Sequence, residues 1–103
     1  MAEHQPRLTP QTILVLDAII NGTAEELTGA DLIRVTGLQT GTLYPILSRL
    51  ERAKWLSARW ENGDPVRLGR PRRRYYRVTG LGVREARKQA RDIEKAVGRL
   101  AWA

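Results

Sequence analysis

The sequence predicts one small α+β domain that is mainly helical, with three helices, a two-stranded hairpin and a long terminal helix. Apolar side chains recur every three or four residues through the first half of the chain, as in amphipathic helices. After residue 55 the pattern changes to the alternation that is typical of strands, and after residue 79 the helical spacing returns. A chain of 103 residues forms a single modest core, whose stability is marginal without a partner chain.

The first helix is expected to begin at Pro10 and to end near Asn21. Thr9 supplies its N-cap, and proline suits the first helical position because the amide hydrogen that it lacks would have no partner there. Residues 1–8 are polar and are expected to form a flexible terminus, ahead of a compact unit that spans residues 9–78.

A second helix is expected after Thr28, where Asp31 places negative charge in the first turn. Gly37 ends this helix, and residues 37–40 then have the length of the turn in a helix-turn-helix. A third helix is expected over residues 40–54. Two helices joined by so short a turn predict the helix-turn-helix arrangement.

The third predicted helix has two unlike faces. One carries an apolar stripe that is expected to face the core, formed by Leu43, Ile46, Leu47 and Leu50. The other carries no acid and offers groups suited to phosphates and base edges: Thr40, Thr42, Tyr44, Pro45, Ser48, Arg49 and Arg52. Such a face suits entry into the major groove of DNA. An ordinary surface helix of a helical domain would show the same pattern.

The hairpin is expected to have strands at residues 56–60 and 72–78, joined by turn residues and a basic loop. Six arginines fall within residues 67–77. The candidates for contact with phosphates or with a narrow minor groove are Gly69, Arg70, Arg72 and Arg73. The alternative is a solvated run of charge. A helix-turn-helix followed by a basic hairpin predicts a winged helix-turn-helix domain.

Positive charge is concentrated in the second part of the chain. Residues 1–66 hold six Lys/Arg and eight Asp/Glu, a net of −2, whereas residues 67–103 hold twelve Lys/Arg and three Asp/Glu, a net of +9. A basic half on a small domain favours a polyanionic partner, most often nucleic acid.

The terminal helix, residues 79–103, is expected to be capped by Thr79 and to mediate dimerisation. Its apolar residues follow a narrow heptad seam made of Val83, Ala86, Ala90, Ile93, Val97 and Leu100. The small body of the domain has little surface left to cover so long a helix. The alternative is a helix that packs back on its own domain.

The aromatic side chains are expected to have different roles. Trp55 and Trp60 are expected to pack where the hairpin meets the helices, and Tyr76 to join the core. Trp102 lies off the heptad seam, and an indole at a chain end suggests an effector-binding role, a contact with a partner's first helix, or a frayed end.

Signals for other classes of protein are weak. The chain has no cysteine, its only histidine is His4, and it contains neither a phosphate-binding loop nor a nucleophile elbow, so neither catalysis nor a metal or cofactor is expected. No signal peptide or membrane-spanning run is visible, so a cytoplasmic protein without membrane contact is expected.

Two blocks of sequence, residues 41–51 (GTLYPILSRLE) and residues 69–79 (GRPRRRYYRVT), followed by Gly82, resemble the PadR family of bacterial transcriptional regulators. The resemblance covers about residues 9–103. It implies a winged helix-turn-helix and a homodimer built through C-terminal helices. It also implies binding to a palindromic operator, usually as a repressor, with repression often relieved by a small aromatic or multidrug-type ligand. It assigns DNA contacts to Thr42, Tyr44, Pro45, Ser48, Arg49, Gly69, Arg70 and Arg72. Many members have Gly-Tyr at the start of the second helix; here Gly29 precedes Ala30, so any contact of that tyrosine is absent.

The expected function is therefore sequence-specific binding of double-stranded DNA by a homodimeric repressor. A small aromatic effector is a further candidate partner. Two other functions fit the same pattern: a winged helix that binds an acidic protein partner, and a nonspecific nucleic-acid or RNA binder.

Overall fold

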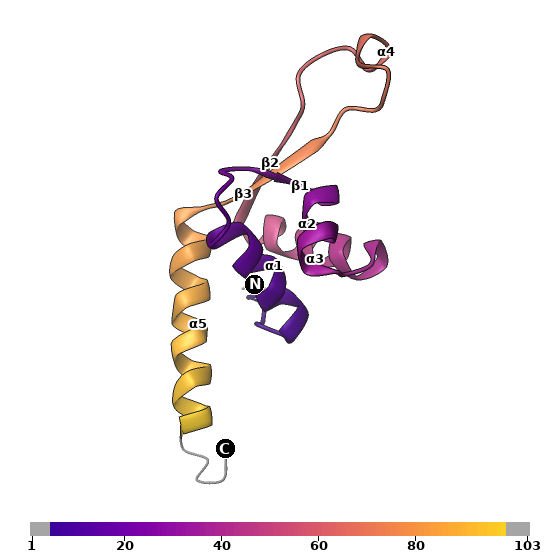
Figure 1. Ribbon diagram of the computed structural model, residues 1–103. Coiled ribbons are helices and arrows are strands. Elements are labelled where there is room, and N and C mark those ends of the chain that lie inside the picture. The colour runs from indigo at the N-terminus through magenta and orange to yellow at the C-terminus, as the bar shows by residue number, and fades with distance from the viewer. Residues whose placement is uncertain (1–4, 99–103) are drawn as a thin grey trace.

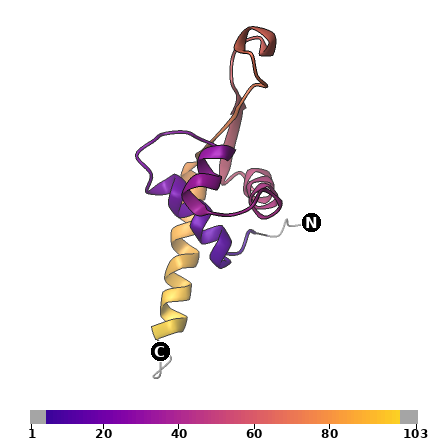
Figure 2. The same ribbon diagram turned by 45° about the vertical axis from the view of Figure 1, so that its right-hand side comes forward.

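The computed structural model describes residues 5–98, which form five helices and three strands (Figure 1). In chain order they are α1 (Pro10–Ile20), β1 (Leu27–Thr28), α2 (Gly29–Thr36), α3 (Thr40–Arg52), β2 (Leu56–Trp60), α4 (Pro65–Leu68), β3 (Arg74–Val78) and α5 (Gly80–Gly98). The first three helices form a body. The β2–β3 hairpin, or wing, extends from one end of this body, and α5 starts at the base of the wing, runs along the body and projects past its opposite end (Figures 1 and 2). The predicted α+β, mainly helical winged fold with a long terminal helix is confirmed.

Side-chain caps set the ends of the first two helices, as the sequence predicts. The hydroxyl of Thr9 accepts a hydrogen bond from the amide of Thr12, and α1 ends at Asn21. At α2, the Thr28 hydroxyl accepts from the amide of Asp31, whose carboxylate accepts from the amide of Thr28. This reciprocal pair satisfies two amides that a helix start otherwise leaves without partners.

The three strands form one antiparallel sheet in the order β1-β3-β2. The short strand β1, which the sequence did not predict, pairs Leu27 with Tyr76 and Thr28 with Tyr75. It ties the connector after α1 to the wing, so the base of the hairpin is fixed to the helical body.

Two boundaries differ from the prediction, and one additional helix is present. The helix α3 ends at Arg52 rather than residue 54, because Lys54 takes a left-handed conformation with φ 67°. Strand β3 begins at Arg74 rather than residue 72. The expected turn contains the one-turn helix α4, which is capped by the carboxylate of Asp64 accepting from the amide of Val66.

The start of α5 is locked to the end of α3. The amide of Thr79 donates to the carbonyl of Trp55 (2.9 Å), and the Thr79 hydroxyl donates to the carbonyl of Lys54 (2.6 Å). That same hydroxyl oxygen accepts from the amide of Gly82 and so caps α5, as predicted. Gly82 is buried, and a Cβ atom there would overlap the Trp55 carbonyl, so only glycine permits this approach.

Part of the expected flexible terminus is held in place. The side-chain amide of Gln89 on α5 donates to the carbonyl of Pro6 (2.6 Å) and accepts from the amide of Leu8 (3.2 Å). Pro6 is buried. The backbone of Pro6 and Leu8 is therefore bonded to α5, and the flexibility expected over residues 1–8 stays a prediction.

The core joins α1, the apolar stripe of α3, the base of the wing and one turn of α5. Its buried hydrophobic members are Val15, Leu16, Ala18, Ile19, Leu32, Leu43, Ile46, Leu47, Leu50, Trp55, Leu56, Tyr76 and Ala86. The expected burial of Trp55 and Tyr76 is confirmed. Within residues 5–98 no helix combines the length and apolarity needed to cross a membrane.

Candidate nucleic-acid interface

The face of α3 that is exposed to solvent is the face for which the sequence predicts DNA contacts. Its stripe of four apolar residues is at most 4% exposed, which fixes the rotation of the helix against the core. All seven candidates are solvent-exposed: Thr40, Thr42, Tyr44, Pro45, Ser48, Arg49 and Arg52. The one acid in α3, Glu51, forms an ion pair with Arg74 of the wing (3.0 Å). Basic and hydroxyl groups therefore dominate this face.

The ring of Tyr44 is held against the start of α2. Tyr44 is 44% exposed, and the hydroxyl end of its ring lies where a Cβ atom on Gly29 would be. This contact holds the hydroxyl end against the start of α2 and limits the directions that the ring can take.

The tip of the wing is braced by one ion pair. The two Nη atoms of Arg70 donate to the two carboxylate oxygens of Glu61, at 2.7 and 2.9 Å. Glu61 also accepts from the amide of Arg73. The Arg70 hydrogen bonds, followed by that from Arg73, lower the pKa of Glu61 to about 2. Arg70 is thus paired within the wing. Glu61 was not predicted from the sequence as a functional residue, although an acid close to a run of arginines is a usable signal for such an ion pair.

Acids of the connector between α1 and β1 neutralise the outer face of the wing. Arg59 donates to Glu26 through two nitrogens, at 2.8 and 3.0 Å, and Arg77 donates to Glu25 at 3.0 Å. The Arg59 guanidinium also lies 4.7 Å from the centre of the Tyr75 ring. These pairs leave this face of the sheet close to electrically neutral.

The opposite face of the wing is joined to α3. Arg74 pairs with Glu51, and its guanidinium lies 4.9 Å from the centre of the Trp60 ring. Trp60 itself is 57% exposed, so the expectation that it packs between hairpin and helices is wrong. It lies at the outer end of β2, where the guanidinium of Arg74 lies over its ring.

Besides the paired Arg59 and Arg77, three arginines of the wing are exposed: Arg67, Arg72 and Arg73. None of them takes part in an ion pair within residues 5–98. Gly69, at φ 69°, ends α4 and begins the return toward β3. The wing therefore presents positive charge at its tip that no ion pair within residues 5–98 neutralises.

Residues 23–88 match the transcriptional regulator PadR-like family. The matched segment includes α2, α3, the whole wing and the first half of α5. The chain belongs to this family. Its members are DNA-binding transcriptional regulators, so the winged domain described above is that of a PadR-like regulator.

Solved structures show the same fold. A PadR-like transcription factor from Bacteroides fragilis is 25% identical, with a TM-score of 0.65 over 89% of this chain and 93% of that chain. A PadR family regulator from Eggerthella lenta DSM 2243 is 29% identical, with a TM-score of 0.62 over 85% and 80%. BpsR of Bordetella bronchiseptica, whose DNA binding is regulated by 6-hydroxynicotinic acid, is 20% identical, with a TM-score of 0.63 over 87% and 64%, and shows likeness of fold alone. A search of curated proteins found no match.

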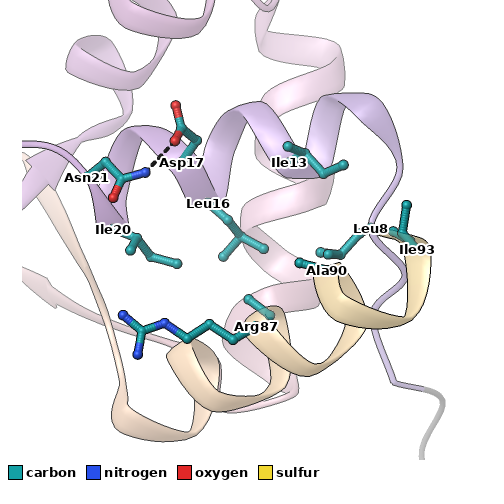
Figure 3. A pocket seen from close by; sticks show the side chains of 10 residues that line it. Leu8, Ile13, Leu16, Asp17, Ile20, Asn21, Arg87, Ala90 and Ile93 are labelled. Atoms are coloured by element: carbon teal, nitrogen blue, oxygen red, sulfur yellow. Dashed lines mark hydrogen bonds between the residues drawn. The ribbon is translucent and has the colours of Figure 1, made fainter. Parts of the chain in front are cut away.

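The PadR-like chain has a second surface of interest, an apolar groove between α1 and α5. The groove has a volume of about 350 Å³ and is lined by Leu8, Ile13, Leu16, Asp17, Ile20, Asn21, Ala86, Arg87, Ala90 and Ile93 (Figure 3). Its floor is apolar, while Arg87, Asp17 and Asn21 supply polar groups.

The residues of the predicted heptad seam do not share one environment. Val83 is half-buried and Ala86 is buried in the core of its own chain, whereas Ala90, Ile93 and Val97 are exposed. Leu100 and Trp102 lie outside the described residues. The first turns of α5 thus pack on their own domain, as the alternative held, and the later turns lie bare.

Proposed function

We propose that this PadR-like chain is a cytoplasmic homodimer that represses transcription by binding a palindromic operator. The observation that carries the proposal is the exposed basic and hydroxyl-bearing face of α3, whose single acid is neutralised, beside a wing with three exposed arginines. A helix of this kind enters the major groove, and the wing contacts the flanking backbone or minor groove.

The division of contacts follows from the two elements. Tyr44, Ser48 and Arg49 reach base edges from α3, while Arg72 and Arg73 hold phosphates or a narrow minor groove. In a two-fold dimer the half-site centres lie roughly 34 Å apart, one turn of the duplex. If about eight phosphates are neutralised, the logarithm of the affinity falls with the logarithm of salt with a slope near −7.

Bare apolar residues on α5 and α1 support the dimer. Ile93 and Val97 are 41% and 51% exposed, and Ile13 and Leu14 on α1 are 43% and 46% exposed. A helix that is apolar along one stripe and exposed there gains by burying the stripe against a second copy. Because Ala86 is already buried within its own chain, the proposed interface uses the later part of the seam, from Ala90 onward.

The groove between α1 and α5 supports a ligand response. Its volume of about 350 Å³ falls in the range of small-molecule sites, and Arg87 at its edge suits an anionic group on an aromatic ligand. The proposal of a small aromatic effector, with Trp102 as a contact, rests on this groove and on the ligand-regulated DNA binding of BpsR.

The test compares DNA upstream of the gene of this protein with a scrambled duplex of equal length, by fluorescence anisotropy at near-physiological salt. At least tenfold tighter binding to the upstream DNA supports a sequence-specific regulator. Equal binding to both, and to RNA, favours a nonspecific binder. Absence of binding to any duplex, with dimerisation retained, favours a protein-interaction module.

A further inference from the structure

We propose that Trp60 is a DNA-contacting residue whose indole packs against the sugar-phosphate strand between the groove entered by α3 and the groove reached by the wing tip. The inference rests on the proposed function and extends it to a residue on neither of the two expected contact segments.

Trp60 is conspicuous because it is large, apolar and bare. The other large aromatic side chain on the same face of the wing, Tyr76, is 5% exposed, whereas Trp60 is 57% exposed. Alternation along β2 and β3 places Leu56, Ala58 and Trp60 on the face that carries Arg74 and Tyr76. Leu56 is buried at the base of the wing, so the exposed fraction of the side chains on this face increases outward along β2 and is large at Trp60.

The indole is nevertheless held in place. Trp60 is directly opposite Arg74 in the register of the sheet, and the Arg74 guanidinium lies 4.9 Å from its ring centre. Arg74 in turn donates to Glu51, the penultimate residue of α3, at 3.0 Å. A chain of two contacts therefore fixes Trp60 relative to the helix that enters the major groove. One face of the ring is covered by the guanidinium, so an incoming group meets the other.

The position of Trp60 favours a strand of DNA over other partners. It lies at the end of β2, between the exposed face of α3 at the base and the exposed arginines of the tip. When a helix occupies the major groove and a wing reaches the adjacent minor groove, the phosphodiester strand that separates the two grooves passes across this interval. Deoxyribose offers C–H groups to an aromatic face, and the indole N–H donates to a phosphate oxygen.

Electrostatics on this face do not oppose a phosphate. Glu51, which shares the Arg74 guanidinium with Trp60, is paired with that arginine, and Glu61, the next residue after Trp60, is paired with Arg70. The acids of the connector, Glu25 and Glu26, pair with arginines on the other face of the sheet. An anionic strand that approaches the other face of the indole therefore meets acids that are already paired with arginines.

The chain contains a matched control on the other face of the wing. Tyr75 also carries a guanidinium over its ring, that of Arg59 at 4.7 Å, and it is adjacent to Arg74 in sequence. Since neighbouring residues of a strand face opposite ways, Tyr75 looks away from the proposed DNA path. We expect Trp60→Ala to weaken operator binding about fivefold to tenfold and Trp60→Phe to retain most of it, while Tyr75→Ala changes it less than about twofold.

The decisive measurement is acrylamide quenching of tryptophan fluorescence in the full-length Trp102→Phe variant, with fluorescein-labelled operator DNA followed by anisotropy in the same titration. Trp55 is 0% exposed, so the quenchable emission belongs to Trp60. We expect the quenching constant of that emission to fall at least about threefold at saturating DNA, and the doubly substituted Trp60→Phe/Trp102→Phe protein to show no such fall.

The outcomes separate this inference from the function on which it rests. A rise in anisotropy with unchanged quenching, or equal loss of affinity in Trp60→Ala and Tyr75→Ala, would overturn the contact of Trp60 and leave the regulator intact. No rise in anisotropy with any duplex would overturn both.

Discussion

The phenol of Tyr44 occupies the space that a Cβ atom on Gly29 would need. Tyr44 is on the exposed side of α3 that we propose faces DNA, and Gly29 is the first residue of α2, which packs against α3. The absence of a side chain at the start of one helix thus sets where a candidate contact residue of the next helix lies. The two helices of the motif fit together at this point because Gly29 has no side chain, not because a side chain fills the space between them.

Replacing Gly29 should therefore disturb Tyr44 first. We expect Gly29→Ala to lower the free energy of unfolding by about 1–3 kcal/mol, the usual range for an overpacked site, and to weaken preference for the operator over random DNA. Gly41→Ala is the control for stability, because a Cβ there meets nothing within 4 Å, and alanine should stabilise the helix slightly. Urea denaturation of both variants checks this; equal effects would contradict it.

Arg70 and Arg72 should respond differently to removal, although both belong to the basic loop. Arg72 is exposed and free, so Arg72→Ala should reduce the salt slope of DNA binding by about 1. Arg70 already pairs with Glu61, so Arg70→Ala should leave the slope nearly unchanged while loosening the wing tip. Affinities measured over a series of salt concentrations test the contrast. A similar drop in slope for both variants would show that Arg70 leaves Glu61 to contact phosphate.

Acid should open the wing tip before it unfolds the domain. The pKa of Glu61 falls from 4.5 to about 2 because its carboxylate accepts hydrogen bonds from Arg70 and from the amide of Arg73. A lowered folded-state pKa means that the ion pair stabilises the folded wing fully above about pH 4.5, and that this stabilisation is lost as the pH falls from 4.5 toward 2.

Hydrogen exchange at the Arg73 amide, corrected for intrinsic rates, reports this opening. We expect its protection to decline across that pH window in the native protein. Glu61→Gln should have weak and pH-independent protection there. If protection at Arg73 holds steady down to pH 2.5, the brace does not control the tip.

The later turns of α5 should hold the dimer. Ile93→Glu places a charge on the bare stripe, and we expect the dissociation constant of the dimer to rise about a hundredfold or more. Lys95→Glu introduces the same side chain about two hundred degrees around the helix and should leave the dimer unchanged. Light scattering behind a sizing column distinguishes the species. A dimer that survives Ile93→Glu would move the interface to another surface.

Local signals in the sequence predicted the elements, because their causes are local. Thr9 and Thr28 cap helices through neighbours three residues away, and the apolar stripe of α3 repeats within a few turns. The exposed face of α3 followed from that stripe. What the sequence could not give depends on distant pairs: the contact between Gln89 and Pro6, the β1–β3 ladder, and the burial of Ala86.

For the candidate site, too, the sequence predicted the segments but not the pairing of individual side chains. Composition located the basic wing, but it did not separate Arg70, which is paired, from Arg72, which is free, since that depends on where Glu61 lies after the hairpin closes. Trp60 was misplaced because alternation shows which face a residue takes, not how far the core extends along that face.

The hydrogen bond from the Thr79 amide to the Trp55 carbonyl links the helix proposed for dimerisation, α5, to the helix proposed for DNA binding, α3. Because the start of α5 is locked just beyond the end of α3, a tilt of α5 against the second copy in the proposed dimer would rotate the winged domain as a rigid unit. The described part of α5 has 19 residues and spans roughly 28 Å, so a tilt of about 10° displaces one end by about 5 Å. In the proposed dimer, a shift of a few ångströms at the far end of α5 would therefore change the distance between the two α3 helices enough that they no longer match successive major grooves of the duplex.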